Sequence, residues 1–540
     1  MKKNVIFLII IISLITLQSV VIAEARYDPS LNWQVLESPH FSVYFSKLQN
    51  SKQNDEDFSN NNEQIAQQIA DIAEETFHQI NAQLGSPDNH HHLQKIAIIM
   101  EDFSDYTQGF ATSSPHRVIR LSLTAPTAKS FDMKFISWLK MVITHEYTHL
   151  AHFEMTAGPT TALRALFGQI LTPNALQPIW STEGLAVYNE TKFTTGGRGI
   201  DSRYDMYLRM ATLENQFNTL DQINGYYLTS WPNGTATYIY GQSLVHFIAQ
   251  KYGENKVIAI SEVFCEYPYL GFNYAIKRVI GLNLEELYQS WKDHLKEKYQ
   301  LQTQKILSQR NLTPSQQLTK YHYWVDYPHW ISTLDGNKIA FKVFTPHSSP
   351  SIQMIDPLSS FAPLTDSSIK NQSLIKRTYG RDSSFDISAD GSKIIYAKLN
   401  DYKQFYNFYD LYLFDLKTKE EIRLSEGLRA RDPSWSPVNP KNPQIVTVIN
   451  QSGTNNLALI NLNSSNSSIN EDQPTNKLIT KDDITYLTDF RDGTQLYQPS
   501  WSPNGDRIAL SAWRQGCQDI YILNLDPNSN LYINNPNPDN

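Results

Sequence analysis

The residues of this chain best suited to chemistry are two histidines four apart, His145 and His149, with a glutamate directly after the first. They lie in the proline-free run 128–158, whose centre is strongly apolar, so we expect a buried helix. Residues four apart share one helical face, and both imidazoles can therefore point at a single metal ion. Glu146 can reach a water molecule on that ion. The pattern predicts a zinc site with a glutamate as general base.

Two histidines do not complete such a site, because hydrolytic zinc has three protein ligands and one water. The candidates for the third ligand are His152, Glu154 and Glu183. His152 lies on nearly the same face as the pair, but a single helix rarely offers three ligands to one ion. Glu154 could take part only if the end of the helix unwound. Glu183 lies on a separate predicted helix, 180–191, and the residues alone leave the choice open.

A second motif lies on this separate helix. The segment Trp180-x-x-Glu183-Gly-x-Ala186 resembles the second ligand helix of the gluzincins, the zinc peptidases that combine H-E-x-x-H with a downstream glutamate. Within that family, the region from about 33 to 300 is similar to the exported peptidase-MA-like group. The resemblance implies an α+β zincin-like metallopeptidase domain that acts on peptides or proteins.

The resemblance also implies one bound Zn²⁺, with His145, His149 and Glu183 as its ligands and Glu146 as the base. The ion would lower the pKa of a bound water and polarise the scissile carbonyl. The gap between the second histidine and the third ligand is longer than in compact family members, which indicates an inserted loop at 157–177.

The developing oxyanion of peptide hydrolysis needs a donor besides the ion. The segment 231–241 places two tyrosines at the start of a predicted helix. Related aminopeptidases have a tyrosine downstream of the glutamate ligand for this role, so Tyr238 and Tyr240 are candidates. The alternative is that both rings pack in the core.

The group that orients the histidines is not identified by the sequence. Some zincins carry an acid one turn beyond the glutamate ligand for this purpose. Here that position is Val187, with Asn189 and Glu190 further along the helix. The short glycine-rich segment 196–199 indicates only a turn. We expect His90–His92 to be surface residues and His116 and His152 to have structural roles.

The elements around the motif are predicted from hydrophobic periodicity. Before it we expect strands at 40–45, 95–100 and 117–123, a helix at 61–84, and a cleft-lining position for 109–111. A sheet edge in such a domain can hold an extended peptide by main-chain hydrogen bonds. After the motif we expect an irregular connection at 163–178 and helices at 207–217, 241–252, 257–264 and 284–309.

Helical periodicity ends near residue 321 and a repeat begins. Its four copies contain the aromatic positions Trp330, Phe385, Trp435 and Trp501, at spacings of 55, 50 and 66 residues. Three copies have an Asp-Gly or Asn-Gly turn before a strand, which is a hairpin signal. A period of this length with short strands indicates propeller blades. Four are few for a closed ring, so the ring is small, completed by another segment or chain, or cut short.

The repeats resemble the TolB-like and WD40-like propellers of bacterial exported proteins, which implies that this domain binds a protein or peptide partner. We expect an all-β propeller domain at 321–528, whose ring of blades is either complete or incomplete. A linker at 311–320 joins it to a peptidase-like domain at 26–310. The last residues, 529–540, are predicted to form a disordered tail.

The N-terminus is predicted to be a signal peptide, 1–25. Lys2 and Lys3 precede an apolar run at 5–12, and Ala23-Glu-Ala25 offers a small-x-small cleavage site. An uncleaved anchor is the alternative. We expect a bacterial periplasmic or secreted protein with no membrane span after the signal is removed.

The composition of the chain limits the classes of molecule that it could bind. The 540 residues carry a net charge of −8 and no long basic block, which argues against nucleic acid. The two cysteines, Cys265 and Cys517, fall in different predicted domains, so a disulfide framework is not expected.

Taken together, the motifs, the repeats and the N-terminus predict an exported zinc metallopeptidase with a propeller for partner or substrate binding. The alternative is a non-catalytic envelope scaffold that binds partners through the propeller.

Overall fold

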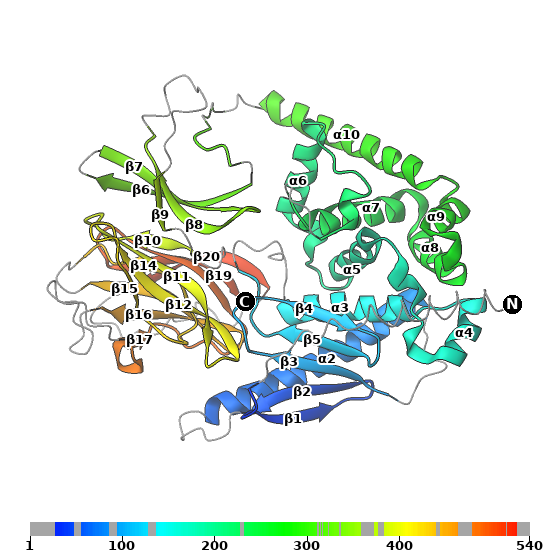
Figure 1. Cartoon of the computed structure of the whole chain (residues 1–540), viewed down its shortest axis with the longest axis horizontal. Coiled ribbons are helices and arrows are strands. Elements are labelled where there is room, and N and C mark those ends of the chain that lie inside the picture. The colour runs from blue at the N-terminus through cyan, green and yellow to red at the C-terminus, as the bar shows by residue number, and fades with distance from the viewer. Residues whose placement is uncertain are drawn as a thin grey trace, which may run out of the picture.

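The structure is a computed structural model with two parts, an N-terminal domain of one sheet and many helices, and a C-terminal group of packed sheets (Figure 1). The predicted signal peptide and tail lie outside the described residues. The structure describes residues 28–47, 56–85, 94–127, 137–226, 232–309, 313, 315, 317–321, 323–333, 336–357, 372–375, 378, 383–438, 443–462, 478–514 and 516–525.

The N-terminal domain is built on a five-stranded sheet with strand order β1-β2-β3-β5-β4. The central strands β2, β3 and β5 run parallel, and β1 and β4 pair antiparallel at the two edges. The short strand β4, where the sequence predicted only a cleft lining, is therefore an edge strand. The strands are β1 (Asn32–Glu37), β2 (Phe41–Lys47), β3 (Ile96–Glu101), β4 (Gly109–Thr112) and β5 (Val118–Ser122).

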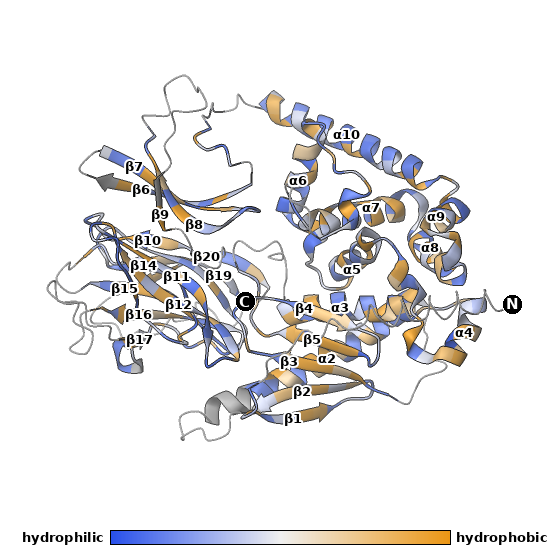
Figure 2. Cartoon of the chain, viewed as in Figure 1, coloured by the Kyte–Doolittle hydropathy of each residue, from blue (hydrophilic) through white to orange (hydrophobic). Residues whose placement is uncertain are grey.

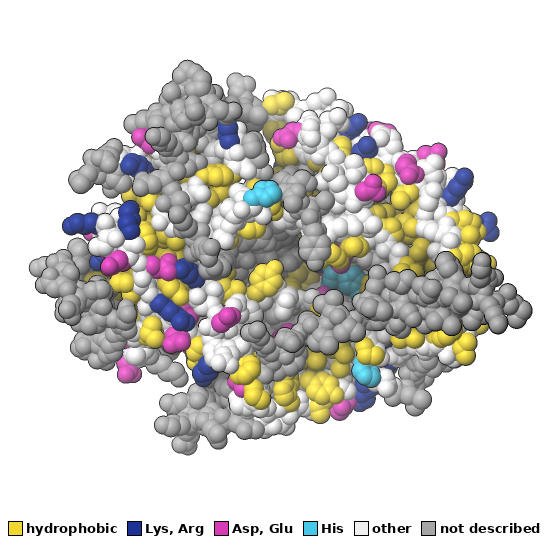
Figure 3. Space-filling view, viewed as in Figure 1, with side chains coloured by type: hydrophobic (Ala, Val, Ile, Leu, Met, Phe, Trp, Pro, Cys, Tyr) yellow, Lys and Arg dark blue, Asp and Glu magenta, His cyan; other side chains and the backbone are white. Residues whose placement is uncertain are grey.

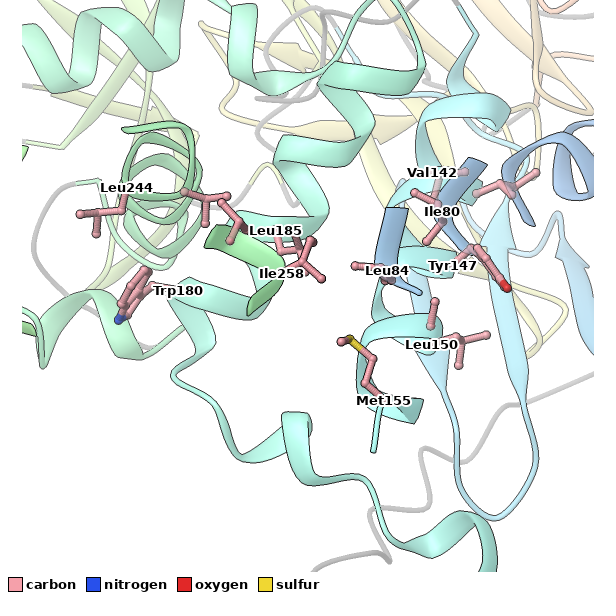
Figure 4. Packing of buried hydrophobic residues seen from close by; sticks show 14 of the residues in the cluster. Ile80, Leu84, Val142, Tyr147, Leu150, Met155, Trp180, Leu185, Leu244 and Ile258 are labelled. Atoms are coloured by element: carbon pink, nitrogen blue, oxygen red, sulfur yellow. The ribbon is translucent and has the colours of Figure 1, made fainter. Parts of the chain in front are cut away.

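One face of this sheet is covered by helices α2 (Glu56–Leu84) and α3 (Trp138–Glu154). Alternate strand residues on that face are fully buried, as the two-residue period of a strand requires. Ile80 and Leu84 of α2 pack beside Tyr147 of α3 (Figure 4). Figure 2 shows that β3 and β5 are largely hydrophobic. The buried strand residues are Phe41, Val43, Ile98, Ile119 and Leu121.

The rest of the N-terminal domain is helical. The predicted irregular connection at 163–178 is wrong in part, because α4 covers 159–167. Pro159 occupies the first turn, where its missing N–H costs nothing, and the residues after it are good helix formers. The helices are α4 (Pro159–Phe167), α5 (Ile179–Phe193), α6 (Ser202–Leu213), α7 (Thr235–Tyr252), α8 (Glu254–Glu266), α9 (Phe272–Ile280) and α10 (Leu284–Gln309), with short 3-10 turns η1 (Gly168–Ile170), η2 (Pro173–Leu176), η3 (Arg198–Ile200), η4 (Gln222–Asn224) and η5 (Pro268–Leu270).

Helices α5 and α7 touch backbone to backbone at two glycines. A Cβ on Gly184 would lie 2.4 Å from the carbonyl oxygen of Gly241, and one on Gly241 would lie 2.1 Å from that of Trp180. No side chain fits at either position. The glycine of the second sequence motif is therefore needed to bring the two helices together.

Four antiparallel sheets follow α10 and confirm the four predicted blades. Three sheets have four strands, and the last has three described strands. Their strands are β6 (Trp324–Thr333), β7 (Gly336–Thr345), β8 (Ser348–Ile355) and β9 (Gln372–Ile375); β10 (Phe385–Ile387), β11 (Lys393–Tyr402), β12 (Tyr406–Asp415) and β13 (Glu421–Arg423); β14 (Ala430–Trp435), β15 (Gln444–Gln451), β16 (Thr454–Asn461) and β17 (Ile484–Tyr486); β18 (Gln495–Trp501), β19 (Arg507–Arg514) and β20 (Cys517–Asn524).

A β-bulge explains part of the repeat. Tyr327, Asp432 and Gln498 have positive φ angles of 53°, 51° and 49°. Each precedes a proline in the first strand of its sheet, where the pairing register shifts. An unpaired bulge position tolerates a proline, which has no N–H to donate to the ladder. The Pro-Ser-Trp pattern thus marks this bend.

The sheets pack face to face in chain order. Separate buried apolar clusters join the first sheet to the second, the second to the third and the third to the fourth. Within the described residues, no such cluster joins the fourth sheet back to the first. The fold class is therefore confirmed as an α+β domain followed by a four-blade propeller arrangement.

The propeller contacts the N-terminal domain through the loop between β3 and β4. The backbone N–H of Asp105 donates to Asn407 O at 2.9 Å, and that of Asn407 donates to Phe103 O at 2.8 Å. Arg429 forms ion pairs with Asp102 and Asp105, both at 2.8 Å. Burial acts to lower the pKa of Arg429, but the two carboxylates hold it above its usual value. A desolvated charge cluster thus fixes this loop.

Charged side chains of both signs are interspersed on the face shown in Figure 3. In the part of the chain that the structure describes, we find no helix with both the length and the apolar character needed to cross a bilayer.

The glycine contact between α5 and α7 can be tested by Gly184→Ala. The added methyl collides with backbone, so we expect a loss of about 1–3 kcal/mol in the free energy of unfolding, measured with chemical denaturant. Gly225→Ala is the matched control, because its φ of −157° is ordinary and nothing lies within 4 Å of its added Cβ. Equal stability of the two variants would contradict the close-contact role of Gly184.

Candidate metal centre

His145 and His149 lie on a helix, α3, that is buried along most of its length. Helix α3 begins after Ser137, whose side chain accepts a hydrogen bond from Lys140 N at 3.3 Å. Every residue from Met141 to His152 is buried. His145 and His149 face the same side, as their spacing predicts, with ring centroids 4.8 Å apart.

Three donor atoms converge at this point. His145 Nε2 and His149 Nε2 are 3.2 Å apart. Glu183 Oε2, on α5, lies 3.2 Å from the first and 3.3 Å from the second. The two helices thus bring together the three residues that the family resemblance implied as ligands, and the donors form a nearly equilateral triangle.

The triangle has the size that a tetrahedral zinc ion requires. Bonds of about 2.0–2.1 Å at tetrahedral angles place neighbouring donors about 3.3 Å apart. The observed separations of 3.2–3.3 Å need no movement to match this value. The donor set, two imidazole nitrogens and one carboxylate oxygen, is also one that hydrolytic zinc sites use. The residues present therefore fit the ion.

Glu183 is oriented by a tyrosine that the sequence did not suggest. The hydroxyl of Tyr226 donates to Glu183 Oε1 at 2.5 Å, which leaves Oε2 directed at the histidines. Burial acts to raise the pKa of Glu183, but His149 and His145 outweigh it and hold the pKa well below its ordinary value. The side chain is thus a carboxylate, the form that binds metal.

His145 is held from behind by Glu190, two helical turns beyond Glu183. Glu190 Oε2 lies 3.0 Å from His145 Nδ1, and Arg198 donates to the same oxygen at 2.7 Å. The backbone N–H and Nε of Arg198 also donate to Glu190 Oε1, at 2.8 and 2.9 Å. Burial acts to raise the pKa of Glu190, but Arg198 and His145 lower it to about 2. Glu190 therefore fixes His145 with Nε2 directed at the other donors.

The two histidines are held in different ways. Burial and Arg198 act to lower the pKa of His145, but hydrogen bonds to Glu183 and Glu190 outweigh them and raise it to about 9. This environment favours a positive charge at the centre. The ring of His149 is held by packing instead, stacked on Phe153 with centroids 5.5 Å apart. Within the described residues, His149 Nδ1 has no hydrogen-bond partner.

Glu146 lies beside the edge strand of the sheet. A Cβ on Gly109 of β4 would lie 2.6 Å from Glu146 Oε1, so only glycine leaves room for this carboxylate. Burial raises the pKa of Glu146, while His145 and His149 oppose the rise. The carboxylate is therefore next to both the donor triangle and β4.

The two predicted tyrosines separate in the structure. Tyr238 lies at the centre, with its ring 6.4 Å from that of His145 and with the guanidinium of Arg198 5.1 Å from its own centroid. Tyr240 points elsewhere. It is buried against Trp291 at 5.5 Å, and its hydroxyl accepts from the backbone N–H of Asn218 at 3.2 Å. A residue two positions along a helix faces nearly the opposite side, so Tyr240 has the core role named as the alternative.

The other candidate ligands bind protein groups away from the triangle. His152 Nε2 lies 2.9 Å from Ser261 Oγ, and burial lowers the pKa of this histidine to about 3. Glu154 faces Arg117 and Arg164 at 3.8 and 3.9 Å. Neither residue belongs to the group around the triangle.

Glu190, Arg198 and Tyr226 were missed as site residues. Glu190 could have been found, because a spacing of seven residues from Glu183 returns to the same helical face. Arg198 lies in the glycine-rich turn that the sequence marked as structural, and its contact with Glu190 depends on the fold of that turn. Tyr226 precedes α7 and carries no periodic signal.

Residues 126–297 match the family model of the Peptidase MA superfamily. This segment is a Peptidase MA superfamily domain. It contains the whole donor triangle and Glu146, and it is shorter than the domain predicted at 26–310. The strands β1 to β5 therefore lie outside the matched segment, although β4 contributes to the centre.

Comparison with solved structures concerns about a third of the chain. A structure described as TolB from Agrobacterium tumefaciens is 17% identical, with a TM-score of 0.25, over 36% of this chain and 60% of that one. The tricorn protease is 13% identical, with a TM-score of 0.19, over 36% of this chain and 21% of that one. Such low scores carry no argument about function. No curated protein sequence matches the chain.

The role of Glu190 behind His145 can be tested by Glu190→Gln. The amide cannot stabilise a positive charge on His145 or neutralise Arg198, so we expect metal affinity to fall about 10–100-fold. Competition with a chromophoric chelator measures the change. The exposed glutamate Glu214 provides the control Glu214→Gln, which should leave affinity unchanged. Unaltered affinity in Glu190→Gln would remove Glu190 from the support of the centre.

Proposed function

We propose that this protein is a zinc-dependent peptidase. The observation that carries the proposal is the triangle of His145, His149 and Glu183, at the separations a tetrahedral zinc ion needs, with Glu146 beside it. The superfamily of the 126–297 segment supports a peptidase independently of this geometry.

The charge of the centre supports a divalent cation. Three buried carboxylates, Glu146, Glu183 and Glu190, face one guanidinium, that of Arg198. Buried charges of one sign are costly unless they are compensated. A divalent cation would balance the two negative charges that Arg198 leaves over. Nitrogen and oxygen donors in a three-ligand arrangement favour zinc among such cations.

The ion, when bound, would supply a Lewis acid that acidifies water and polarises the substrate carbonyl. Glu146 would take a proton from the attacking water and later give it to the leaving amine. Burial raises the pKa of its carboxyl above the ordinary value, which makes the carboxylate a stronger proton acceptor. Tyr238 remains the candidate donor to the developing oxyanion, because its ring lies beside His145.

The substrate would lie along β4 as an added strand. Ser122 N donates to Gln108 O at 3.0 Å, which fixes the alternation of hydrogen bonds between β4 and β5. In that alternation the backbone groups of Gly109 and Ala111 point away from β5. An extended peptide could pair with them, and Gly109 would place it next to Glu146. This arrangement suits an unfolded segment of a peptide or protein.

We further propose that the protein is exported to the periplasm or secreted, on the basis of Lys2, Lys3 and the apolar run 5–12. These residues lie outside the described part of the chain. The propeller would bind a protein partner or deliver substrate to the peptidase domain. In the alternative, the propeller alone is functional and the peptidase-like domain is a scaffold.

The proposal is tested by Glu146→Gln. The amide cannot accept the water proton but leaves the three donors in place, so we expect kcat to fall about 10²–10⁴-fold with zinc content unchanged. Cleavage of a peptide library measures activity, and elemental analysis measures zinc. Glu183→Ala is the contrasting variant, which should also lose the ion of this centre. No cleavage by the zinc-loaded parent would favour the scaffold alternative.

The contact between the propeller and the loop that leads into β4 predicts a second effect on activity. Arg429→Met leaves the buried Asp105 and the partly buried Asp102 without their cation, so the loop that leads to β4 should shift. We expect kcat/KM to fall by at least about tenfold, since small displacements at a site are costly, with zinc content unchanged. The exposed Arg491 gives the control Arg491→Met. Equal kcat/KM in both variants would show that the loop contact does not shape the site beside β4.

A further inference from the structure

A second group of metal-binding side chains lies outside the candidate centre. His40 immediately precedes β2, and Glu74 and His78 lie one turn apart on α2. One donor atom from each residue lies within 4.8 Å of the donors of the other two. This is the same set of two imidazoles and one carboxylate as in the buried centre, but here it is open to solvent.

The carboxylate of this group is held in place by the chain around it. Glu74 Oε1 accepts from Ser38 Oγ at 2.6 Å and from the backbone N–H of His40 at 2.8 Å. These bonds direct Oε2 towards His40 Nδ1, 2.6 Å away. The carboxylate is therefore oriented before any ion arrives, which reduces the entropy lost on binding. A bound ion would replace the hydrogen bond between Oε2 and Nδ1, because two zinc ligands stand about 3.3 Å apart.

The two rings are also positioned. His40 stacks on Phe77, with centroids 3.8 Å apart and planes inclined by 16°. His78 stands edge-on to His40, with centroids 5.7 Å apart. The side chain of Glu74 is 19% exposed and that of His40 is 29% exposed, while His78 is exposed. His78 is thus free to turn on the solvent side and close on an ion that the other two residues hold.

We propose that His40, Glu74 and His78 form a second divalent-cation site, of the class that binds Zn²⁺, which ties the start of β2 to α2. Imidazole and carboxylate donors suit zinc and the neighbouring late transition metals. Three protein ligands leave the remaining positions to water, because the site opens to solvent.

Residues next to this second site pack directly on α3, the helix that carries the candidate centre. Phe77 and Phe41 pack on Tyr147 of α3, with ring centroids 5.6 and 5.9 Å apart. An ion that joins β2 to α2 therefore braces the layer against which α3 packs. Its role is structural, and a bound ion raises the temperature of unfolding because it binds the folded state only.

The test is a zinc titration of the chelator-treated full chain against a chromophoric competitor. In every protein compared, His90–His92 are replaced by alanine, because a histidine triplet can bind zinc by itself. The parent should bind two ions, and His78→Ala should bind one. The exposed His116 gives the control His116→Ala, which should bind two. Alanine is a good helix former, so His78→Ala should remain folded.

Variants of the buried centre separate the two sites. Glu183→Ala should retain one ion, bound through His40, Glu74 and His78, and the double variant Glu183→Ala with His78→Ala should retain none. In addition, the second equivalent of zinc should raise the unfolding temperature of the parent but not of His78→Ala. Binding of one ion by the parent would overturn the proposal. So would a His78→Ala variant that binds the second ion with less than a tenfold loss of affinity.

Discussion

The structure of the candidate centre depends on burying the carboxylates of Glu183 and Glu190 between α3 and α5, each bound by groups that offset part of its charge. Glu190 is fully buried, and such a carboxylate is stable only because Arg198 and His145 both bind it. Glu183 is balanced in turn by two imidazoles and a tyrosine hydroxyl. The same network that neutralises the carboxylates also sets the directions of the donor atoms. Electrostatic compensation and site geometry are therefore one requirement.

This network tolerates little change in the spacing of its helices. The donors of α3 and α5 already lie at zinc-compatible separations, so a shift of about 1 Å would spoil the triangle. The position of α5 is fixed from its other side by α7, which Gly184 and Gly241 allow to approach to backbone contact. The glycine next to the third donor thus acts through packing, and it sets the position of Glu183 without touching the centre.

The sequence predicted those parts of the site that local geometry determines. Two histidines on one helical face follow from their spacing, and Glu183 followed from the resemblance of a short motif. The sequence did not distinguish Tyr238 from Tyr240. The rotation of α7, which begins at Thr235, decides which of the two rings faces the metal centre and which faces the core. Arg198 and Tyr226 reach the centre only through tertiary folding, and nothing in their local sequence indicates it. The four blades were predicted because a sequence repeat can be recognised without knowledge of the tertiary contacts.

The contact of the propeller with the N-terminal domain bears on how the two could work together. The loop fixed by Asp105 and Arg429 leads directly into β4, whose Gly109 lies against Glu146. A second contact places Met141, at the start of α3, in one apolar cluster with Tyr497 and Trp513 of the last blade. The propeller thus touches the loop that leads into β4 and the helix α3, which both border the centre. Through these contacts a displacement of the propeller would reach the centre directly, whereas a domain tethered only by its linker would leave the centre undisturbed.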